Sequence, residues 1–175
     1  MTNKKVEKAL NEQINIEEYS SRIYVAMASW CEANAYPGSA LYMYKQADEE
    51  RFHQLKFMKY VNDREGHAIL QLSEQPEIKF KSLIEVFEKA LKHEKFVSAS
   101  INKLYGICLD EKDYTSSNFV QWFVNEQIEE ESNARGILDK FKLLGKKEDS
   151  MYLIDKELEA KGLAKVVPSI YNPIV

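Results

Sequence analysis

Glycine and proline are scarce in this sequence, with six and four residues among 175. No proline lies between Pro76 and Pro168. Because both residue types interrupt helices and form the turns of β-rich folds, their scarcity favours long helices and argues against an all-β fold. Hydrophobic residues still make up 45% of the chain and charged residues 30%, which is typical of a globular domain rather than a disordered chain.

Other absences limit the classes of function. The net charge is −4 and no basic stripe is present, so we expect no nucleic acid partner. The two cysteines, Cys31 and Cys108, form no metal-type pair, and we expect both to be small apolar residues in a reducing compartment. No run approaches the ~20 apolar residues of a membrane span, and the N-terminal residues lack the apolar stretch of a signal peptide. We therefore expect a soluble cytoplasmic protein without a membrane partner.

Turn-forming residues divide the chain into long helical segments. Four helices are expected at about Asn3 to Asn34, Ser39 to Arg64, Ser82 to Leu109 and Ser117 to Leu144. Helices of this length are each about 40 Å long at 1.5 Å per residue. A short fifth helix is expected near Ser150 to Ala160, ahead of Gly162.

The connections between these segments predict an all-α four-helix bundle. Short turns join the first helix to the second and the third to the fourth, so each pair should be antiparallel. The stretch from His67 to Lys79 is long enough to cross the length of the bundle, which gives one long crossover. We assign residues 1–162 to this domain, including the short fifth helix, and residues 163–175 to an apolar tail.

Each long helix carries a stripe of residues, three and four positions apart, that should face the other helices. An acid interrupts each stripe near its middle: Glu17, Glu50, Glu94 and Glu130. Isolated buried carboxylates are costly, and the stripes contain no Lys or Arg, so we do not expect ion pairs to offset that cost. Either the acids are protonated or a cation lies among them. Carboxylates with one imidazole, His53, suit iron or manganese.

A repeat in the sequence strengthens the metal interpretation. The residues Glu17, Glu50 and His53 recur 77 positions later as Glu94, Gln127 and Glu130. Glu49 and Glu126 have the same offset. Two helical hairpins would thus bring equivalent positions together across a pseudo-twofold axis. One Glu from each of two helices, plus an i, i+3 pair from each of the other two, is the arrangement of di-metal carboxylate proteins.

The chain resembles the bacterial non-haem ferritins from its first residues to about Ala160. The matching stretches are NEQINIEEYSS around Glu17, DEERFHQ around Glu50, LKHEKF around Glu94 and QWFVNEQIEEE around Glu130. LLGKKEDSMYLIDKEL resembles the short fifth helix of that family. The resemblance implies a ferritin-like bundle that assembles as a shell of 24 subunits, oxidises Fe(II) with O2 or H2O2, and stores ferric mineral.

The resemblance also implies a role for each matching residue. The first iron would be held by Glu17, Glu50 and His53, and the second by Glu50, Glu94 and Glu130. Gln127 would lie beside the second iron, and Tyr24 next to the pair as a one-electron donor. A third iron site would be formed by Glu49, Glu126, Glu129 and Glu130. The alternatives are purely structural roles. Gln127 would then be a packed polar residue, Tyr24 a core aromatic residue, and Glu49, Glu126 and Glu129 residues of a solvated helix face.

Other expectations follow from differences between this sequence and related families, and from residues not yet assigned a role. Arg51 stands where bacterioferritins have a haem-ligating Met, so we expect no haem. The absence of a CxxC module argues against a full rubrerythrin, although a rubrerythrin-like di-iron peroxidase remains the rival function, with a purely structural bundle as a third class. We expect His67, in the crossover, and His93 to lie on the surface, and Trp122 to be packing. The tail should lie extended against its own subunit or a neighbour, burying Val166, Val167 and Ile170, with a role in cohesion rather than chemistry.

Overall fold

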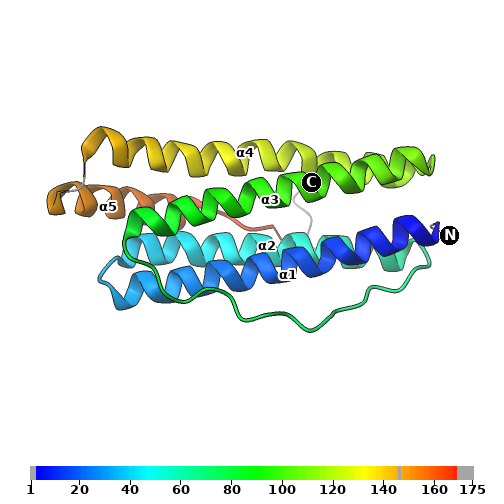
Figure 1. Cartoon of the computed structure of the whole chain (residues 1–175), viewed down its shortest axis with the longest axis horizontal. Coiled ribbons are helices and arrows are strands. Elements are labelled where there is room, and N and C mark those ends of the chain that lie inside the picture. Colours follow the sequence, from blue (N-terminus) through cyan, green and yellow to red (C-terminus); the bar gives the residue numbers. More distant parts are fainter. Residues whose placement is uncertain (1–2, 146, 169–175) are drawn as a thin grey trace.

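The computed structural model describes residues 3–145 and 147–168, and every regular element in that part of the chain is a helix. In chain order the elements are α1 (Lys4–Ala33), α2 (Pro37–Asp63), α3 (Leu83–Asp110), α4 (Tyr114–Leu144) and α5 (Glu148–Ala164) (Figure 1). The expected all-α bundle with one long crossover and a fifth helix is therefore confirmed. In the described part of the chain, no helix is both long and apolar enough to cross a bilayer.

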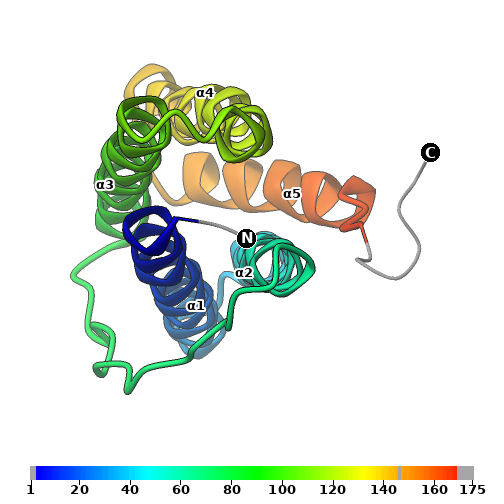
Figure 2. The ribbon, with the colours of Figure 1, turned by 90° about the vertical axis from the view of Figure 1, so that its right-hand side faces the viewer.

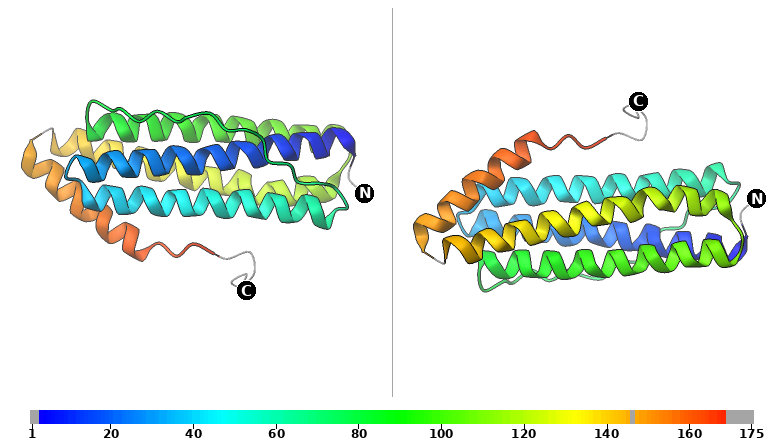
Figure 3. Two further views of the ribbon diagram at one scale, coloured as in Figure 1. Left: turned by 90° about the horizontal axis from the view of Figure 1, so that it is seen from below. Right: turned by 90° about the horizontal axis from the view of Figure 1, so that it is seen from above.

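The four long helices form the corners of the bundle, with α1 beside α2 and α3 beside α4 (Figure 2). The connection from α2 to α3 runs along the outside of the bundle from one end to the other (Figure 1). Helix α5 lies obliquely at one end, and the chain after it continues alongside α2 (Figure 3). This path brings Lys165, the first residue after α5, to Gln46 and Glu49 of α2.

Local signals explain where the first four helices begin. The side chains of Asn3, Ser82 and Asp113 each accept a hydrogen bond from a backbone N–H in the first turn of α1, α3 and α4. Helix α2 begins at Pro37 itself, two residues before the expected Ser39, because proline suits the first turn of a helix. Helix α4 begins at Tyr114, three residues before the expected Ser117, because Asp113 is its cap.

The fifth helix differs most from expectation. It ends at Ala164 rather than near Ala160, so Gly162 lies within the helix instead of after it. A Cβ on Gly162 would come within 2.9 Å of Leu41 Cγ and 3.1 Å of the Tyr42 backbone nitrogen. Gly162 therefore serves close packing of α5 on α2 rather than helix termination.

Asp155 fixes the other contact between α5 and α2. Its carboxylate accepts hydrogen bonds from the backbone N–H of Gly38 at 3.0 Å and of Ser39 at 2.7 Å, and from the Ser39 hydroxyl at 2.7 Å. A buried carboxylate at a helix N-terminus is stabilised by the free N–H groups and by the helix dipole. Asp155 and Gly162, seven positions apart, thus hold α5 in one orientation.

Two asparagines of α1 hold the crossover by its backbone. Asn11 donates to the carbonyl of His67 at 3.1 Å and accepts from the N–H of Ile69 at 2.6 Å. Asn15, one helical turn later, donates to the carbonyl of Ile69 at 3.0 Å and accepts from the N–H of Gln71 at 2.7 Å. These side-chain amides satisfy backbone groups that have no sheet partner in this extended segment.

The apolar core is divided into two clusters. One contains Met43, Phe87 and Phe141, and the other contains Phe57 and Phe123. On each long helix the buried acids lie between the residues of one cluster and those of the other. The polar layer is therefore enclosed by apolar packing at both ends, which keeps its dielectric low.

Candidate metal centre

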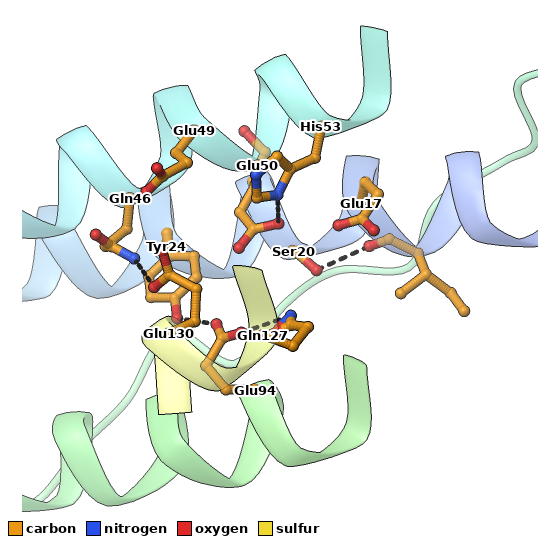
Figure 4. Close-up of polar contacts among 12 residues, drawn as sticks. Glu17, Ser20, Tyr24, Gln46, Glu49, Glu50, His53, Glu94, Gln127 and Glu130 are labelled. Atoms are coloured by element: carbon orange, nitrogen blue, oxygen red, sulfur yellow. Dashed lines mark hydrogen bonds and ion pairs between the residues drawn. The ribbon is translucent and has the colours of Figure 1, made fainter. Parts of the chain in front are cut away.

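Glu17, Glu50 and His53 form a compact group between α1 and α2. All three side chains are buried, and each offers a ligand atom within 4.8 Å of those of the others. His53 Nδ1 lies 3.5 Å from Glu50 Oε2. Glu17 Oε1 accepts a hydrogen bond from Gln13 Nε2 at 2.7 Å. Figure 4 shows the three side chains extending into the interior between the helices.

Three buried atoms of this group lack hydrogen-bond partners. Within the described part of the chain, Glu17 Oε2, Glu50 Oε2 and His53 Nε2 have no hydrogen bond. Buried polar atoms are nearly always hydrogen-bonded, so three exceptions in one place point to a ligand. Two carboxylates and an imidazole are a donor set for iron, manganese or zinc. The residues present therefore fit the metal that the sequence predicts.

The other two helices supply Glu94, Gln127 and Glu130, which have protein partners instead. Tyr24 donates its phenolic O–H to Glu94 Oε1, and Gln127 donates to Glu94 Oε2 at 3.2 Å. Gln46 of α2 donates to Glu130 Oε2 at 2.7 Å. Among the described residues, no equally compact metal-type group includes Glu94 or Glu130. The residues predicted for the second metal thus lie next to the expected position, but their ligand atoms do not converge on one point.

The electrostatics of the centre favour protonated acids when no cation is bound. Burial, followed by the charge of Glu50, holds the pKa of Glu17 well above its usual range. Burial and then the charge of Glu94 do the same to the pKa of Glu50. The pKa of Glu94 rises to about 8 for the same reason, with Glu130 as the main charged neighbour. A cation placed among these groups would reverse the shifts by stabilising the carboxylates.

A second compact group lies next to the first and shares its histidine. Glu49, His53 and Glu126 each offer a ligand atom within 4.8 Å of the others, and both acids are partly buried. Burial raises the pKa of Glu49 to about 7, with Glu130 as the main charged neighbour. Glu129 is exposed and does not belong to this group. The structure thus places two of the acids assigned to a third site together, with His53 beside them.

One cation beside the centre was not expected from the sequence. Lys165, the first residue after α5, forms an ion pair with Glu49, donates a hydrogen bond to Gln46 Oε1 and lies 3.6 Å from Glu130 Oε1. Burial opposes its charge, but Glu130 and Glu49 outweigh burial and raise the pKa of Lys165. The expectation that no ion pair offsets the buried acids is therefore wrong. It considered only the helix stripes, whereas the cation comes from the tail.

The tail was expected to bury Val166 and Val167 against its own subunit or a neighbour; within this subunit Val167 is half-buried, whereas Val166 is not buried. Its side chain is 75% exposed. Lys165, in contrast, lies against the bundle, and its side chain is only 20% exposed. Ile170 lies outside the described residues, and burial of Val166 against a neighbouring subunit stays a prediction.

The remaining residues singled out from the sequence divide into two groups. His67 is exposed, and Cys31 and Cys108 are buried, as expected. His93 was expected at the surface but is half-buried, and its Nε2 lies 2.7 Å from Ser20 Oγ. Burial lowers the pKa of His93 to about 4, so this imidazole is neutral at physiological pH. Trp122 is about one-third exposed and its ring meets His53 edge-on at 5.5 Å.

Comparison with known proteins agrees with this architecture. The ferritin-like domain family matches residues 7–144. A bacterial non-haem ferritin of Campylobacter jejuni is 44% identical over 165 residues, which cover 94% of this chain and 99% of that protein. A probable bacterial non-haem ferritin-like protein of Haemophilus influenzae is 41% identical, covering 90% and 96% of the two chains.

A solved structure shows the same fold. An engineered closed form of the Archaeoglobus fulgidus ferritin superposes with a TM-score of 0.91 at 34% identity, covering 96% of this chain and all of that one. The open-pore ferritin of the same archaeon gives a TM-score of 0.88 at 36% identity, covering 90% and 96%. With its family match, its relatives and its inward-facing carboxylates, the chain belongs to the ferritin-like family, among the bacterial non-haem ferritins.

Proposed function

We propose that this protein stores iron and that its buried centre oxidises Fe(II) to Fe(III) on the way to storage. The observation that carries the proposal is the compact Glu17, Glu50 and His53 group, whose unpartnered atoms face the interior of a ferritin-like bundle. The relatives named as non-haem ferritins support iron as the metal. Iron is here the substrate and the cargo rather than a resident cofactor, and the function requires no haem.

Each half of the centre would bind one Fe(II) ion. Glu17, Glu50 and His53 are already close together and would bind the first Fe(II). Glu50, Glu94 and Glu130 would bind the second, which requires Glu94 and Glu130 to exchange their present amide and phenol partners for the ion. Binding displaces protons from acids whose pKa is raised, so loading should become weaker as the pH falls.

Oxidation is balanced over two ions. Each Fe(II) loses one electron, and O2 takes up both electrons and two protons to give H2O2; H2O2 itself can serve as the two-electron acceptor in place of O2. Collecting two electrons at one site avoids release of a one-electron product. The protein fixes the separation and orientation of the ions, while the iron carries the redox chemistry. Tyr24, whose phenolic O–H donates a hydrogen bond to Glu94, would lie beside the pair and would supply one electron when the oxidant takes up more than the two electrons of the iron pair.

The neighbouring Glu49, His53 and Glu126 group is proposed as the third iron site, with Glu130 at its edge. Glu129 is exposed in this structure and would join the site only by a side-chain movement toward it. We further propose assembly into a shell of 24 subunits in the cytoplasm. Such a shell of 20.4 kDa chains has a mass of about 490 kDa.

The alternative is a di-iron peroxidase of the rubrerythrin type, which reduces a small oxidant without storing iron. Both functions use the same centre, so the distinction lies in assembly and in the fate of Fe(III). A particle of about 490 kDa that retains ferric iron after repeated additions supports storage. A small oligomer that consumes H2O2 and retains no mineral supports the peroxidase.

The site assignment is tested with the double variant Glu50→Ala, His53→Ala. Aerobic Fe(II) addition to the parent should give a fast rise in ultraviolet absorbance from ferric product, and the variant should lose this fast phase while keeping the helical circular dichroism of the parent. Asp48→Ala removes an exposed acid of the same helix and should oxidise Fe(II) at the parental rate. A double variant that retains the parent's initial rate would show that the assignment is wrong.

A further inference from the structure

Lys165 is held in place by the docking of α5 rather than by chance contact. The hydrogen bonds of Asp155 and the close packing of Gly162 fix α5 against α2, and Lys165 follows Gly162 by three residues. Residues 165–168 continue without helical structure alongside α2 (Figure 3). The lysine side chain therefore reaches the bundle from a rigid support.

The ammonium group sits within a closed polar network. It pairs with Glu49 and donates to Gln46 Oε1, while Gln46 Nε2 donates to Glu130 Oε2 at 2.7 Å. Glu130 Oε1 lies 3.6 Å from the same ammonium. The side chains of Glu49 and Glu130 are only 13% and 4% exposed, so little water screens these charges.

Both acids of this network belong to proposed metal positions. Glu49 forms a compact group with His53 and Glu126, and Glu130 borders the second position of the di-iron centre. Figure 4 shows Glu49, Gln46 and Glu130 along one side of the centre. A divalent cation that binds Glu49 would compete with Lys165 for that carboxylate, and it would be repelled by the ammonium if that group stayed.

We propose that Lys165 is a built-in counter-ion, paired with Glu49 and Glu130 beside the third metal position, whose ammonium must leave before a divalent cation binds at that position. This inference rests on the proposed function, because it concerns the third site of that centre. Lys165 thus competes with metal for these acids. It neutralises Glu49 and Glu130 while metal is absent, and it weakens metal binding at the third position alone. Metal binding at the third position is therefore coupled to release of the Lys165 side chain from these acids.

Zinc titration tests the competition without redox chemistry. Metal-free shells of the parent, of Lys165→Met and of the control Lys161→Met are titrated with Zn(II) in a calorimeter. Lys161 is an exposed lysine one turn earlier on α5. In Lys165→Met the weakest of the three binding events should become about tenfold tighter, while the two tighter events and the control match the parent. Loss of that event in Glu49→Ala, Glu126→Ala would assign it to the third position.

Lysine footprinting tests the release in the unmodified protein. A small acylating reagent is applied with and without saturating Zn(II), and modification is read by peptide mass spectrometry. Acylation of Lys165 should be slow in the metal-free shell and should accelerate severalfold with Zn(II), while Lys161 reacts equally in both. Because this measurement needs no variant, it decides the question even if Lys165→Met fails to assemble.

Two results would overturn the inference. One is a third event in Lys165→Met that is unchanged or weaker than in the parent, and the other is a Lys165 that is acylated equally with and without Zn(II). Fe(II) oxidation by the parent is measured alongside. Normal oxidation with either result overturns the role of Lys165 alone, whereas absence of both oxidation and tight Zn(II) binding overturns the proposed function as well.

Discussion

Replacing Glu94 by Gln should stabilise the metal-free protein at neutral and alkaline pH. Glu94 is buried at 0% exposure and its pKa is about 8, against an ordinary carboxyl value of 4.5. A carboxyl whose pKa is raised on folding binds more protons in the native than in the unfolded state, so stability falls as pH rises between the two values. At about 1.4 kcal/mol per pH unit, the cost above pH 8 is on the order of 5 kcal/mol.

The variant should avoid this cost without losing hydrogen bonds. Glutamine at position 94 can still accept from Tyr24. Its new amide group can donate to Gln127 Oε1, which has no partner within the described part of the chain, once the Gln127 amide turns over. For a chain of this size, a gain of 5 kcal/mol corresponds to a rise in melting temperature of about 10–20 °C, and coupling with Glu130 makes the lower end the better expectation.

The assay is scanning calorimetry of metal-free protein in chelator from pH 5 to pH 9. The parent should melt at progressively lower temperature as the pH rises, whereas Glu94→Gln should have a shallower slope, melt about 10 °C higher near pH 8 and approach the parent near pH 5. Glu129→Gln, which removes an exposed acid of α4, should follow the parent throughout. A Glu94→Gln variant with the parental slope, or with a lower melting temperature at pH 8, would refute the reasoning.

Three further outcomes are expected. Asp155→Ala should lower the free energy of unfolding by about 2–4 kcal/mol, read by thermal melting, because it leaves the N–H groups of Gly38 and Ser39 buried without partners. Gly38→Ala should cost about 2–3 kcal/mol in the same measurement, since its Cβ would lie 2.0 Å from the carbonyl oxygen of Asp155. Glu49→Ala with Glu126→Ala should change the ratio of iron oxidised to oxygen consumed, and later turnovers, more than the first oxidation event; loss of the first event with an unchanged ratio would contradict a separate third site.

The grouping of Glu17, Glu50 and His53 could be anticipated because helical periodicity decides which residues share a face. Steps of three and four place each acid on the inner stripe of its helix, and the 77-residue repeat relates the two hairpins. The hydrogen-bond partners of Glu94 and Glu130 were harder to predict from the sequence. Gln46 lies on the inner stripe of α2, but nothing in its spacing distinguishes a hydrogen-bond donor to Glu130 from polar packing.

Lys165 could not be found from any helical pattern. Its position depends on the direction in which the chain turns after α4 and on the packing of α5 through Asp155 and Gly162. The contacts of Asp155 and Gly162 with α2 join segments that are more than a hundred residues apart in sequence. The prediction that His93 is exposed was wrong for a related reason. His93 lies one position off the inner stripe of α3, where Ser20 of α1 contacts it.

The asparagine contacts on the crossover have a consequence for tolerated changes in loop length. Asn11 and Asn15 hold the backbone of residues 67, 69 and 71, so alternate backbone groups of this extended segment face α1. Inserting one residue between 67 and 71 would shift every following backbone group out of register with the two amides and turn the groups that now face α1 away from it. A two-residue insertion would preserve that alternation. Natural length variation in this connection is therefore expected after residue 71, and in steps of two residues wherever it occurs before that point.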